Sequence, residues 1–370
     1  MIIESVTLAD FRNYRKQVVE LAPGLNFLVG ANGEGKTNFL ESIYALALSR
    51  SYKAEDREMI RFESPFARAR ASIVGPSGRT DLQLILAEDG KKALRNGQEI
   101  RRLSDYVGQL NVVLFAPEDM NLVKGSPVDR RRFLDVILGQ IDRRYLDDLN
   151  EYRHALKQRN ELLKRAQTGA NVDRDLLDVL TEQLAVAGEE VVAKRGAFVK
   201  AIDRKAAEAY RFLAVKREDL GVTYQPSVPE NLLGTLKTRI RTDLFAGTTN
   251  HGPHRDDLGF TLNGMSAASF ASQGEQRMIV LAIDLALLEY IEETKRDRPL
   301  FLLDDVLSEL DREKQNRLLR RLAESGIQAV VTATDLTDIA EDIVRPSRIF
   351  RVTNGTIKEE HHGQQHPEQP

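Results

Sequence analysis

Apolar residues recur at two different spacings, which divide the chain into strand-rich ends and a helical middle. Alternating apolar and polar residues predict a pair of strands in the first 21 residues and a further strand over 80–87. Asn-Gly pairs at 96–97, 263–264 and 354–355 predict two-residue hairpins. Short, continuous apolar runs predict buried strands over 25–29, 112–115, 299–303 and 329–333.

The middle of the chain has the spacing of helices. From 127 to 217 apolar residues recur every three or four positions, and Thr168-Gly169-Ala170-Asn171 interrupts the pattern. We expect an antiparallel helical arm whose limbs have about 35–40 residues and reach on the order of 50–60 Å. Gly139, Gly188 and Gly196 are expected to interrupt or bend the limbs.

This pattern predicts an α/β protein with an inserted helical domain. We expect a discontinuous head, formed by residues 1–120 and 245–358, that combines a mixed sheet and helices with an antiparallel β subdomain. Residues 121–244 are expected to form the arm, and the polar residues 359–370 a disordered tail.

Composition narrows the classes of protein that fit. The 370 residues include no cysteine, so disulfides and thiolate metal sites are excluded. No apolar run approaches the roughly 20 residues that span a bilayer, and the first residues read as a strand, so we expect a cytoplasmic protein. The formal net charge of −3 is small, so any nucleic-acid binding must come from local basic patches.

One stretch carries a specific chemistry. Gly30 to Thr37 is a complete G-x-x-x-x-G-K-T between a buried strand and a helix, the arrangement of a phosphate-binding loop. Lys36 is expected to reach the β- and γ-phosphates, and the Thr37 hydroxyl to bind Mg²⁺. The residues expected to bind ATP here are Gly30, Ala31, Asn32, Gly33, Glu34, Gly35, Lys36, Thr37 and Asn38.

Two later segments fit the same chemistry. Asp304 and Asp305 follow a buried strand; we expect Asp304 to assist Mg²⁺ binding and Asp305 to polarise the attacking water. Ser272, with Glu275 three residues later, forms a capping box at the start of an apolar helix. That helix start is a second possible anion site, although on its own an ordinary capped helix is the better explanation.

Basic residues and histidines leave their roles open. The first limb is rich in arginine, including Arg130, Arg131, Arg132, Arg143 and Arg144, and a DNA-binding face or a solvated helix face fits it equally well. Arg12 and Arg15 suit phosphate or a solvated turn. His251 and His254 lie near two aspartates, but their spacing fits no standard metal site, and a loop beside the nucleotide is the favoured interpretation.

Taken in order, the loop, the Ser272 turn and Asp304-Asp305 resemble the Walker A, signature and Walker B motifs of ABC-type ATPases. The resemblance implies that Asp311 is the D-loop aspartate and that one subunit's signature completes the partner's nucleotide site. The signature residues would be Ser272, Gln273, Gly274, Glu275 and Gln276. The usual second Walker B glutamate is Asp305 here, so slow hydrolysis is expected; a Q-loop glutamine and a switch histidine are not evident.

A fuller pattern resembles the RecF family of bacterial recombination mediators. It comprises Phe11-Arg12-Asn13-Tyr14, the Gly30–Asn38 loop, residues 115–119, 122–125 and 130–135, Gly252-Pro253-His254-Arg255-Asp256-Asp257, residues 272–277, and 302–305 with 308–311. The resemblance implies ATP and Mg²⁺ binding, with Arg12 near the nucleotide, and a weak, DNA-dependent ATPase activity. It further implies ATP-dependent dimers on gapped DNA or single-strand/double-strand junctions, which act with RecR and RecO to load RecA.

Three other functions compete with this interpretation. A transporter ATPase subunit would need a membrane partner, and the helical arm argues against it. A structural organiser of the SMC kind would need a far longer arm to enclose DNA. A nucleotide sensor that does not hydrolyse ATP would bind ATP but would lose nothing when Asp305 is replaced by asparagine.

Overall fold

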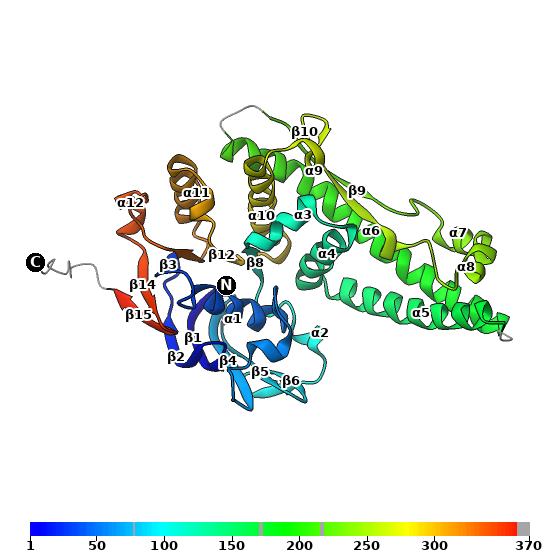
Figure 1. Ribbon diagram of the computed structural model, residues 1–370, viewed down its shortest axis with the longest axis horizontal. Helices are drawn as coiled ribbons and strands as arrows, with labels where there is room; N and C mark the ends of the chain where they lie inside the picture. Colours follow the sequence, from blue (N-terminus) through cyan, green and yellow to red (C-terminus); the bar gives the residue numbers. More distant parts are fainter. Residues whose placement is uncertain (77, 170–172, 215–217, 361–370) are drawn as a thin grey trace, which may run out of the picture. The chain divides into compact units, whose positions relative to one another are not determined.

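The chain folds into two compact units. The computed structural model describes residues 1–76, 78–169, 173–214 and 218–360. The first unit joins Met1–Asp119 to Asp284–Pro370, and the second is formed by Met120–Ile283 (Figure 1). The second unit is therefore inserted into the chain of the first.

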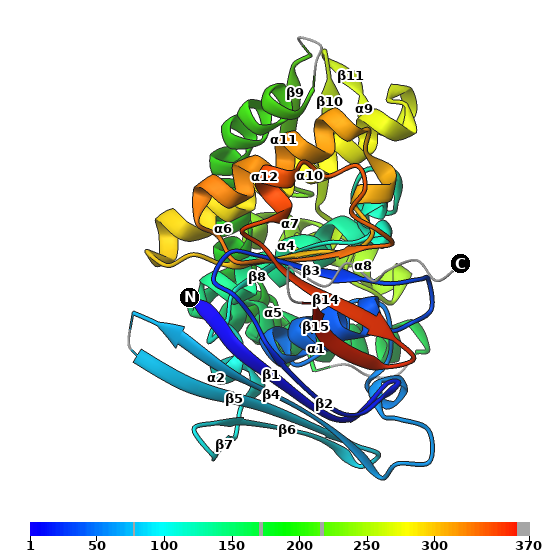
Figure 2. The same ribbon diagram turned by 90° about the vertical axis from the view of Figure 1, so that its left-hand side faces the viewer.

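The first unit contains two six-stranded sheets. One is antiparallel, in the order β2-β1-β4-β5-β6-β7, and Figure 2 shows these strands side by side. The other has the order β15-β14-β3-β13-β12-β8 and is parallel except for the β14–β15 hairpin. The strands are β1 (Ile2–Phe11), β2 (Tyr14–Glu20), β3 (Leu25–Val29), β4 (Phe66–Gly75), β5 (Gly78–Ala87), β6 (Gly90–Arg95), β7 (Gln98–Ile100), β8 (Val112–Phe115), β12 (Leu300–Leu303), β13 (Ala329–Ala333), β14 (Arg348–Thr353) and β15 (Thr356–Glu360).

Helix α1 forms the core of this unit. It packs against β1, β4 and β5 of the antiparallel sheet and against β8 and β13 of the parallel one, so nearly all of its residues are buried. Small side chains on β4, at Ala67, Ala69 and Ala71, face inward and let the helix approach closely. The helices are α1 (Lys36–Leu48), α2 (Leu103–Tyr106), α11 (Arg312–Ser325) and α12 (Glu341–Val344), with 3₁₀ turns η1 (Asp56–Met59), η2 (Pro117–Met120) and η4 (Leu307–Glu309).

The second unit is mainly helical. Its longest helix, α6, has 40 residues and extends about 60 Å at 1.5 Å per residue, beside α5 (Figure 1). The elements are α3 (Asn121–Lys124), α4 (Pro127–Ile141), α5 (Arg143–Gln167), α6 (Arg174–Leu213), β9 (Leu220–Gln225), α7 (Leu232–Thr238), α8 (Ile240–Ala246), η3 (Pro253–Arg255), β10 (Asp257–Leu262), β11 (Met265–Ser266) and α9 (Ala267–Phe270). Helix α10 (Gln273–Lys295) runs across the boundary between the units.

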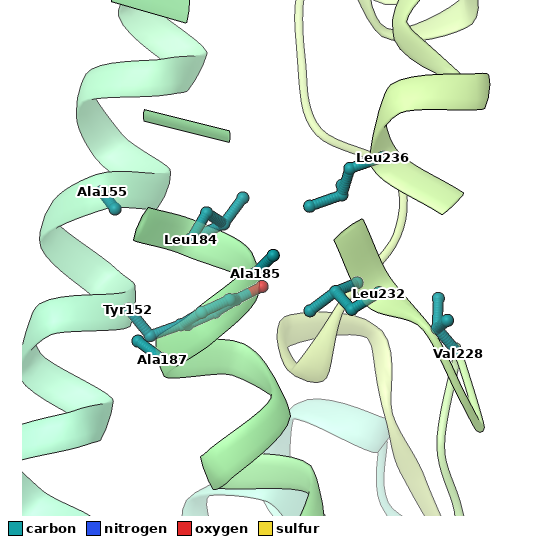
Figure 3. Packing of buried hydrophobic residues seen from close by; sticks show 8 residues of the cluster. All are labelled: Tyr152, Ala155, Leu184, Ala185, Ala187, Val228, Leu232 and Leu236. Carbon is teal, nitrogen blue, oxygen red and sulfur yellow. The ribbon is translucent and has the colours of Figure 1, made fainter. Parts of the chain in front are cut away.

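Gly188 lies at a tightly packed point in the core of the arm. Tyr152 and Ala155 of α5, Leu184, Ala185 and Ala187 of α6, and Val228, Leu232 and Leu236 form one buried cluster (Figure 3). A Cβ atom on Gly188 would lie 2.6 Å from Leu232 Cδ2 and 3.1 Å from Tyr152 Cε2. Gly188 therefore allows close packing, and α6 continues through it and through Gly196.

The first limb of the arm differs from the prediction because an aspartate, and not a glycine, divides it. Asp142 is extended, with φ −129° and ψ 105°, and it separates α4 from α5. Its carboxylate accepts a hydrogen bond from the Tyr145 amide at 3.2 Å, so it caps the new helix.

Two boundaries also differ from the predicted ones. Residues 245–283, which we expected in the head, lie in the second unit, because β10 pairs with β9 just after α6. Glu359 and Glu360, expected in a disordered tail, belong to β15 and pair with Arg348 and Arg351. The remainder of that tail, 361–370, lies outside the described residues.

Strand β1 is irregular near its start. A register irregularity between Ile3 and Ser5 places Ile3, and not Ile2, on the buried face with Val6 and Leu8.

Among the helices in the described ranges, none has the length and apolar character needed to cross a membrane.

Candidate nucleotide-binding site

The phosphate-binding loop connects β3 to α1, as the sequence predicts. Gly35 has φ +118°, and a Cβ atom there would lie 2.5 Å from Asn13 Nδ2; one on Gly30 would lie 2.3 Å from the Val352 carbonyl oxygen. The Lys36 ammonium donates to the carbonyl oxygens of Gly30 (2.6 Å) and Ala31 (2.9 Å). Lys36 is thus folded back over the loop that a phosphate would fill.

Asp304 lies at the end of β12, within a shell of hydroxyl groups. Its Oδ1 accepts from Thr37 Oγ1 (2.9 Å) and Thr332 Oγ1 (3.1 Å), and its Oδ2 accepts from the Tyr52 hydroxyl (3.1 Å). Burial raises the pKa of Asp304, and these three hydrogen bonds oppose the rise. The arrangement therefore gathers oxygen atoms around a buried carboxylate.

This set of atoms suits Mg²⁺. A small, hard cation takes oxygen ligands, commonly one carboxylate and a hydroxyl together with substrate phosphates. Thr37 Oγ1 and Asp304 Oδ1 lie 2.9 Å apart, and Asp304 is only 4% exposed, so its charge lacks full solvation. Thr37 and Asp304 are the residues that would hold the ion.

Asp305 is set in place by the neighbouring strand. Its φ of +53° is a left-handed conformation that aspartate tolerates better than most residues. Its amide donates to Thr332 Oγ1 at 2.8 Å, so Thr332 of β13 binds both acids. Burial lowers the pKa of Lys36, while the charges of Asp305, Asp304 and Glu34 oppose that change.

Arg12 is held by a buried acid. Its guanidinium forms two 2.8 Å hydrogen bonds with Glu41, which is fully buried in α1 and also accepts from Ser51 Oγ at 2.5 Å. The hydrogen bonds with Glu41 raise the pKa of Arg12. Arg12 is therefore held in a fixed position against α1.

The turn between β1 and β2 supports the phosphate loop directly. Asn13 Nδ2 donates to the Glu34 carbonyl (3.2 Å), Asn38 Nδ2 donates to Asn13 Oδ1 (2.9 Å), and the buried Tyr14 hydroxyl donates to the Gly35 carbonyl (2.9 Å). The structure thus gives the Phe11–Tyr14 motif a physical role, which is to hold the loop in shape.

The residues expected to form the signature lie at the start of α10, in the second unit. The Ser272 amide donates to Glu275 Oε2 (2.7 Å) and the Glu275 amide to Ser272 Oγ (3.3 Å), which is the predicted capping box. Ser272, Gln273 and Gly274 are exposed, whereas Gln276 is buried and donates to the Ala271 carbonyl (2.9 Å). Asp311, in the first unit, caps α11 by accepting from the Lys314 amide (2.9 Å).

The candidate DNA-binding arginines fall into two groups. Arg130 forms a two-pronged pair with Asp257 (2.6 and 2.9 Å), and Arg131 donates to the Asp256 carbonyl (2.7 Å). Arg132, Arg143 and Arg144 are exposed, and Arg143 lies 3.7 Å from Asp147. The first two arginines are thus engaged within the arm, and the exposed three are the accessible ones.

The histidine segment serves the arm as well. His254 Nδ1 hydrogen-bonds with the Tyr152 hydroxyl at 2.5 Å, and its Nε2 with the Thr249 carbonyl at 3.0 Å, so both ring nitrogens are engaged. Burial lowers the pKa of His254 to about 4. Within the described ranges no group of three or more His, Cys, Asp or Glu side chains could hold a metal.

Sequence reasoning missed three residues of the site. Tyr52, Glu41 and Thr332 belong to none of the motifs identified in the sequence. The one available signal was at Glu41, a charged residue at a position where the apolar helix after the loop faces inward.

Comparisons with known proteins agree with the geometry. Residues 2–358 match the family model of the RecF/RecN/SMC N terminal domain. The DNA replication and repair protein RecF of Ligilactobacillus salivarius is 41% identical over 97% of this chain and 98% of its own, and that of Shouchella clausii is 42% identical over 97% and 99%. A solved RecF–ATP structure, of a recombination mediator protein in the RecFOR pathway, superposes with a TM-score of 0.89, at 28% identity, covering 97% of each chain.

These matches extend over nearly the whole length of this chain and of each RecF protein, and they include the arm. They argue against the two alternative interpretations, a transporter ATPase subunit and a structural organiser with a longer arm. They also agree with the ABC-type head described above, in which a phosphate loop and a strand-end acid meet at one sheet edge. The chain belongs to the RecF family of SMC-like ATPases, whose members are DNA replication and repair proteins.

Proposed function

We propose that this protein is an ATP-hydrolysing, DNA-binding recombination mediator that dimerises when it binds ATP. The observation that carries the proposal is the meeting of Lys36, Thr37 and Asp304 at one edge of the parallel sheet, with 2.9 Å between the Thr37 and Asp304 oxygens. Its relatives are named for DNA replication and repair, and the RecF–ATP structure supports ATP as the nucleotide.

The residues divide the chemistry among them. Lys36 exchanges the carbonyl groups of Gly30 and Ala31 for the β- and γ-phosphates of ATP, and Thr37 and Asp304 would hold Mg²⁺. The ion, when bound, neutralises charge on the phosphate oxygens. Asp305 orients a water that attacks the γ-phosphorus, and the bond to the β–γ bridging oxygen breaks to release ADP and phosphate. Asp305 has a shorter side chain than glutamate, so hydrolysis is slow.

Dimerisation uses the start of α10. Ser272, Gln273 and Gly274 are exposed, and the first amide groups of a helix attract anions. In the proposed dimer these residues bind the γ-phosphate held by the partner's loop, with Asp311 of each subunit at the interface. ATP thereby links two copies, and hydrolysis separates them.

Duplex DNA is bound mainly through its phosphates. Arg132, Arg143 and Arg144 are the exposed members of the basic set and are our candidate contacts, which makes binding strongly dependent on salt. We infer gapped DNA or single-strand/double-strand junctions as the target, RecR as the direct partner, and RecO and RecA as later members of the pathway.

The test is sedimentation of the pure protein with and without ATP–Mg²⁺, each with and without gapped duplex DNA. An ATP-dependent dimer that carries DNA is expected, and a monomer under all four conditions would contradict the proposal. Lys36→Ala should abolish ATP binding and dimers, whereas Ser272→Arg should bind ATP as a monomer. Asp305→Asn should dimerise but not turn over; unchanged turnover would remove Asp305 from the mechanism.

A further inference from the structure

A hollow beside the phosphate loop contains an exposed aromatic ring. It is lined by Arg12, Asn13, Arg61, Phe62 and Glu63, is open to solvent on one side, and has a volume of about 540 Å³. That size falls within the roughly 300–1,000 Å³ typical of small-molecule sites. Phe62 is 85% exposed. A single exposed apolar residue is common on protein surfaces, so the position of this ring matters more than its exposure.

The segment that carries Phe62 is fixed by its backbone. The Arg61 amide donates to the Asp10 carbonyl (2.8 Å), and the Arg12 amide to the Met59 carbonyl (2.9 Å). Ile60 forms an isolated antiparallel bridge with Phe11. The backbone that carries Phe62 is therefore attached to the β1–β2 turn.

The same turn holds the phosphate loop. Asn13, which lines the hollow, donates to the Glu34 carbonyl at 3.2 Å, and the neighbouring Tyr14 donates to Gly35. Phe62 is thus joined to the loop by two successive sets of hydrogen bonds. A rigid connection of this kind suits a ring that must lie at a set distance from bound phosphates.

Another side of the loop is closed. The backbone of Val352 lies so near Gly30 that a Cβ atom there would be 2.3 Å from its carbonyl oxygen, and the Asn354 and Gly355 amides of the β14–β15 turn donate to Glu34. Within the described part of the first unit, the hollow at Arg12 and Phe62 therefore offers the ribose and base of a loop-bound nucleotide an open side.

We propose that Phe62 stacks on the base of the nucleotide whose phosphates the loop holds. The inference rests on the proposed function, because it requires a nucleoside triphosphate in that loop. Every base has a flat π-face, so stacking on Phe62 adds affinity without choosing between adenine and guanine. Arg12, fixed by Glu41, forms a firm wall of the same hollow.

The test compares ligands with and without a base. Binding of ATP, GTP and inorganic tripolyphosphate, each with Mg²⁺, is measured by calorimetry for the parent protein and for Phe62→Ala. We expect about fivefold to a hundredfold weaker binding of ATP and GTP, with tripolyphosphate unchanged. The control is Phe245→Ala, because Phe245 is also 85% exposed but lies in the second unit.

A second variant reads the stacking directly. The chain contains no tryptophan, so Phe62→Trp introduces one fluorophore at the proposed contact. Its emission should change with ATP and GTP but not with tripolyphosphate, and Phe245→Trp should respond to none of them.

Several results would overturn the inference. The inference fails if Phe62→Ala binds ATP as tightly as the parent protein, or if it loses equal affinity for ATP and for tripolyphosphate. It also fails if the variant binds ATP normally but no longer dimerises, because Phe62 would then be a subunit contact. Failure of the proposed function looks different, because then Lys36→Ala would leave the affinity of all three ligands unaltered.

Discussion

The arm contains an ion pair that is completely buried, and its removal gives a sharp prediction. Arg159 and Asp243 are both 0% exposed, and Arg159 Nη1 donates to Asp243 Oδ2 at 2.9 Å. The other carboxylate oxygen accepts from the amide (3.2 Å) and the side chain (3.1 Å) of Asn250. Both oxygens are therefore in use.

Asp243→Asn keeps the shape of the side chain but replaces one of these oxygens with an NH₂ donor. Whichever way the amide turns, a donor then faces either the guanidinium or the Asn250 donors, and the Arg159 charge is left uncompensated. Breaking a buried pair in this way costs about 3–5 kcal/mol. Since the urea dependence of unfolding is about 1–3 kcal/mol per M, the midpoint should fall by at least about 1 M.

The assay is urea unfolding of the full chain, followed by helical circular dichroism. Glu182→Gln is the matched control, because Glu182 and Lys237 form a 2.8 Å pair in the same unit with both side chains about half exposed, and exposed pairs add little. Arg159→Met combined with Asp243→Asn should recover part of the loss, since it removes the buried charge. A midpoint for Asp243→Asn equal to that of Glu182→Gln would refute this reasoning.

Three further predictions concern protonation and backbone shape. The pKa of His254 falls from 6.5 in the unfolded chain to about 4 in the folded arm, so its contribution to stability is complete above pH 6.5 and about 3 kcal/mol is lost as the pH falls towards 4. The urea midpoints at pH 7 and pH 4.5 should therefore differ less in His254→Gln than in the parent protein, and an equal difference in both proteins would argue against this role of His254. Burial raises the pKa of Asp304, so its ionised form lowers the stability of the fold above the folded-state pKa, and this cost fades as the pH falls. At pH 7.5 and without ligand, Asp304→Asn should therefore melt no lower than the parent protein. It should nevertheless lose the rise in melting temperature that ATP–Mg²⁺ causes in the parent. Gly35→Ala should weaken ATP binding by about 1–3 kcal/mol, because φ is +118° and the new Cβ would lie 2.5 Å from Asn13 Nδ2. Gly33→Ala is the comparison, since Gly33 has φ +85° but open space around it, and it should lose less ATP affinity in the same titration.

The phosphate loop, most strands and the three Asn-Gly hairpins were predictable because their signals are local. The shell around Asp304 was not, since Thr37 and Tyr52 lie near the two ends of α1 whereas Asp304 and Thr332 come from the end of β12 and from β13, at least 252 residues later, and their meeting depends on how the strands pair. The order β3-β13-β12-β8 brings those segments to one sheet edge. Periodicity within a segment carries no information about that order.

The positions of two buried arginines in the sequence carry a signal that a count of basic residues overlooks. Arg159 lies three residues after Leu156 and four before Leu163, and Arg195 lies four after Val191 and three before Phe198, so both occupy the apolar stripe. A count of basic residues along the first limb does not separate Arg159 from the exposed arginines. A charged residue on a buried stripe predicts an internal partner, which here is Asp243 for Arg159 and Asp135 for Arg195.

The position of the arm within the chain has a consequence for how the protein is made. Strand β3 is synthesised early, yet both of its sheet neighbours, β13 and β14, come after the entire inserted unit. On a ribosome adding about 5–20 residues per second, β3 and the loop it carries must wait many seconds with both edges unpaired. The arm can form its own core during that interval. ATP binding would therefore be gained only when nearly the whole chain has emerged, which makes the nucleotide a check on completed synthesis.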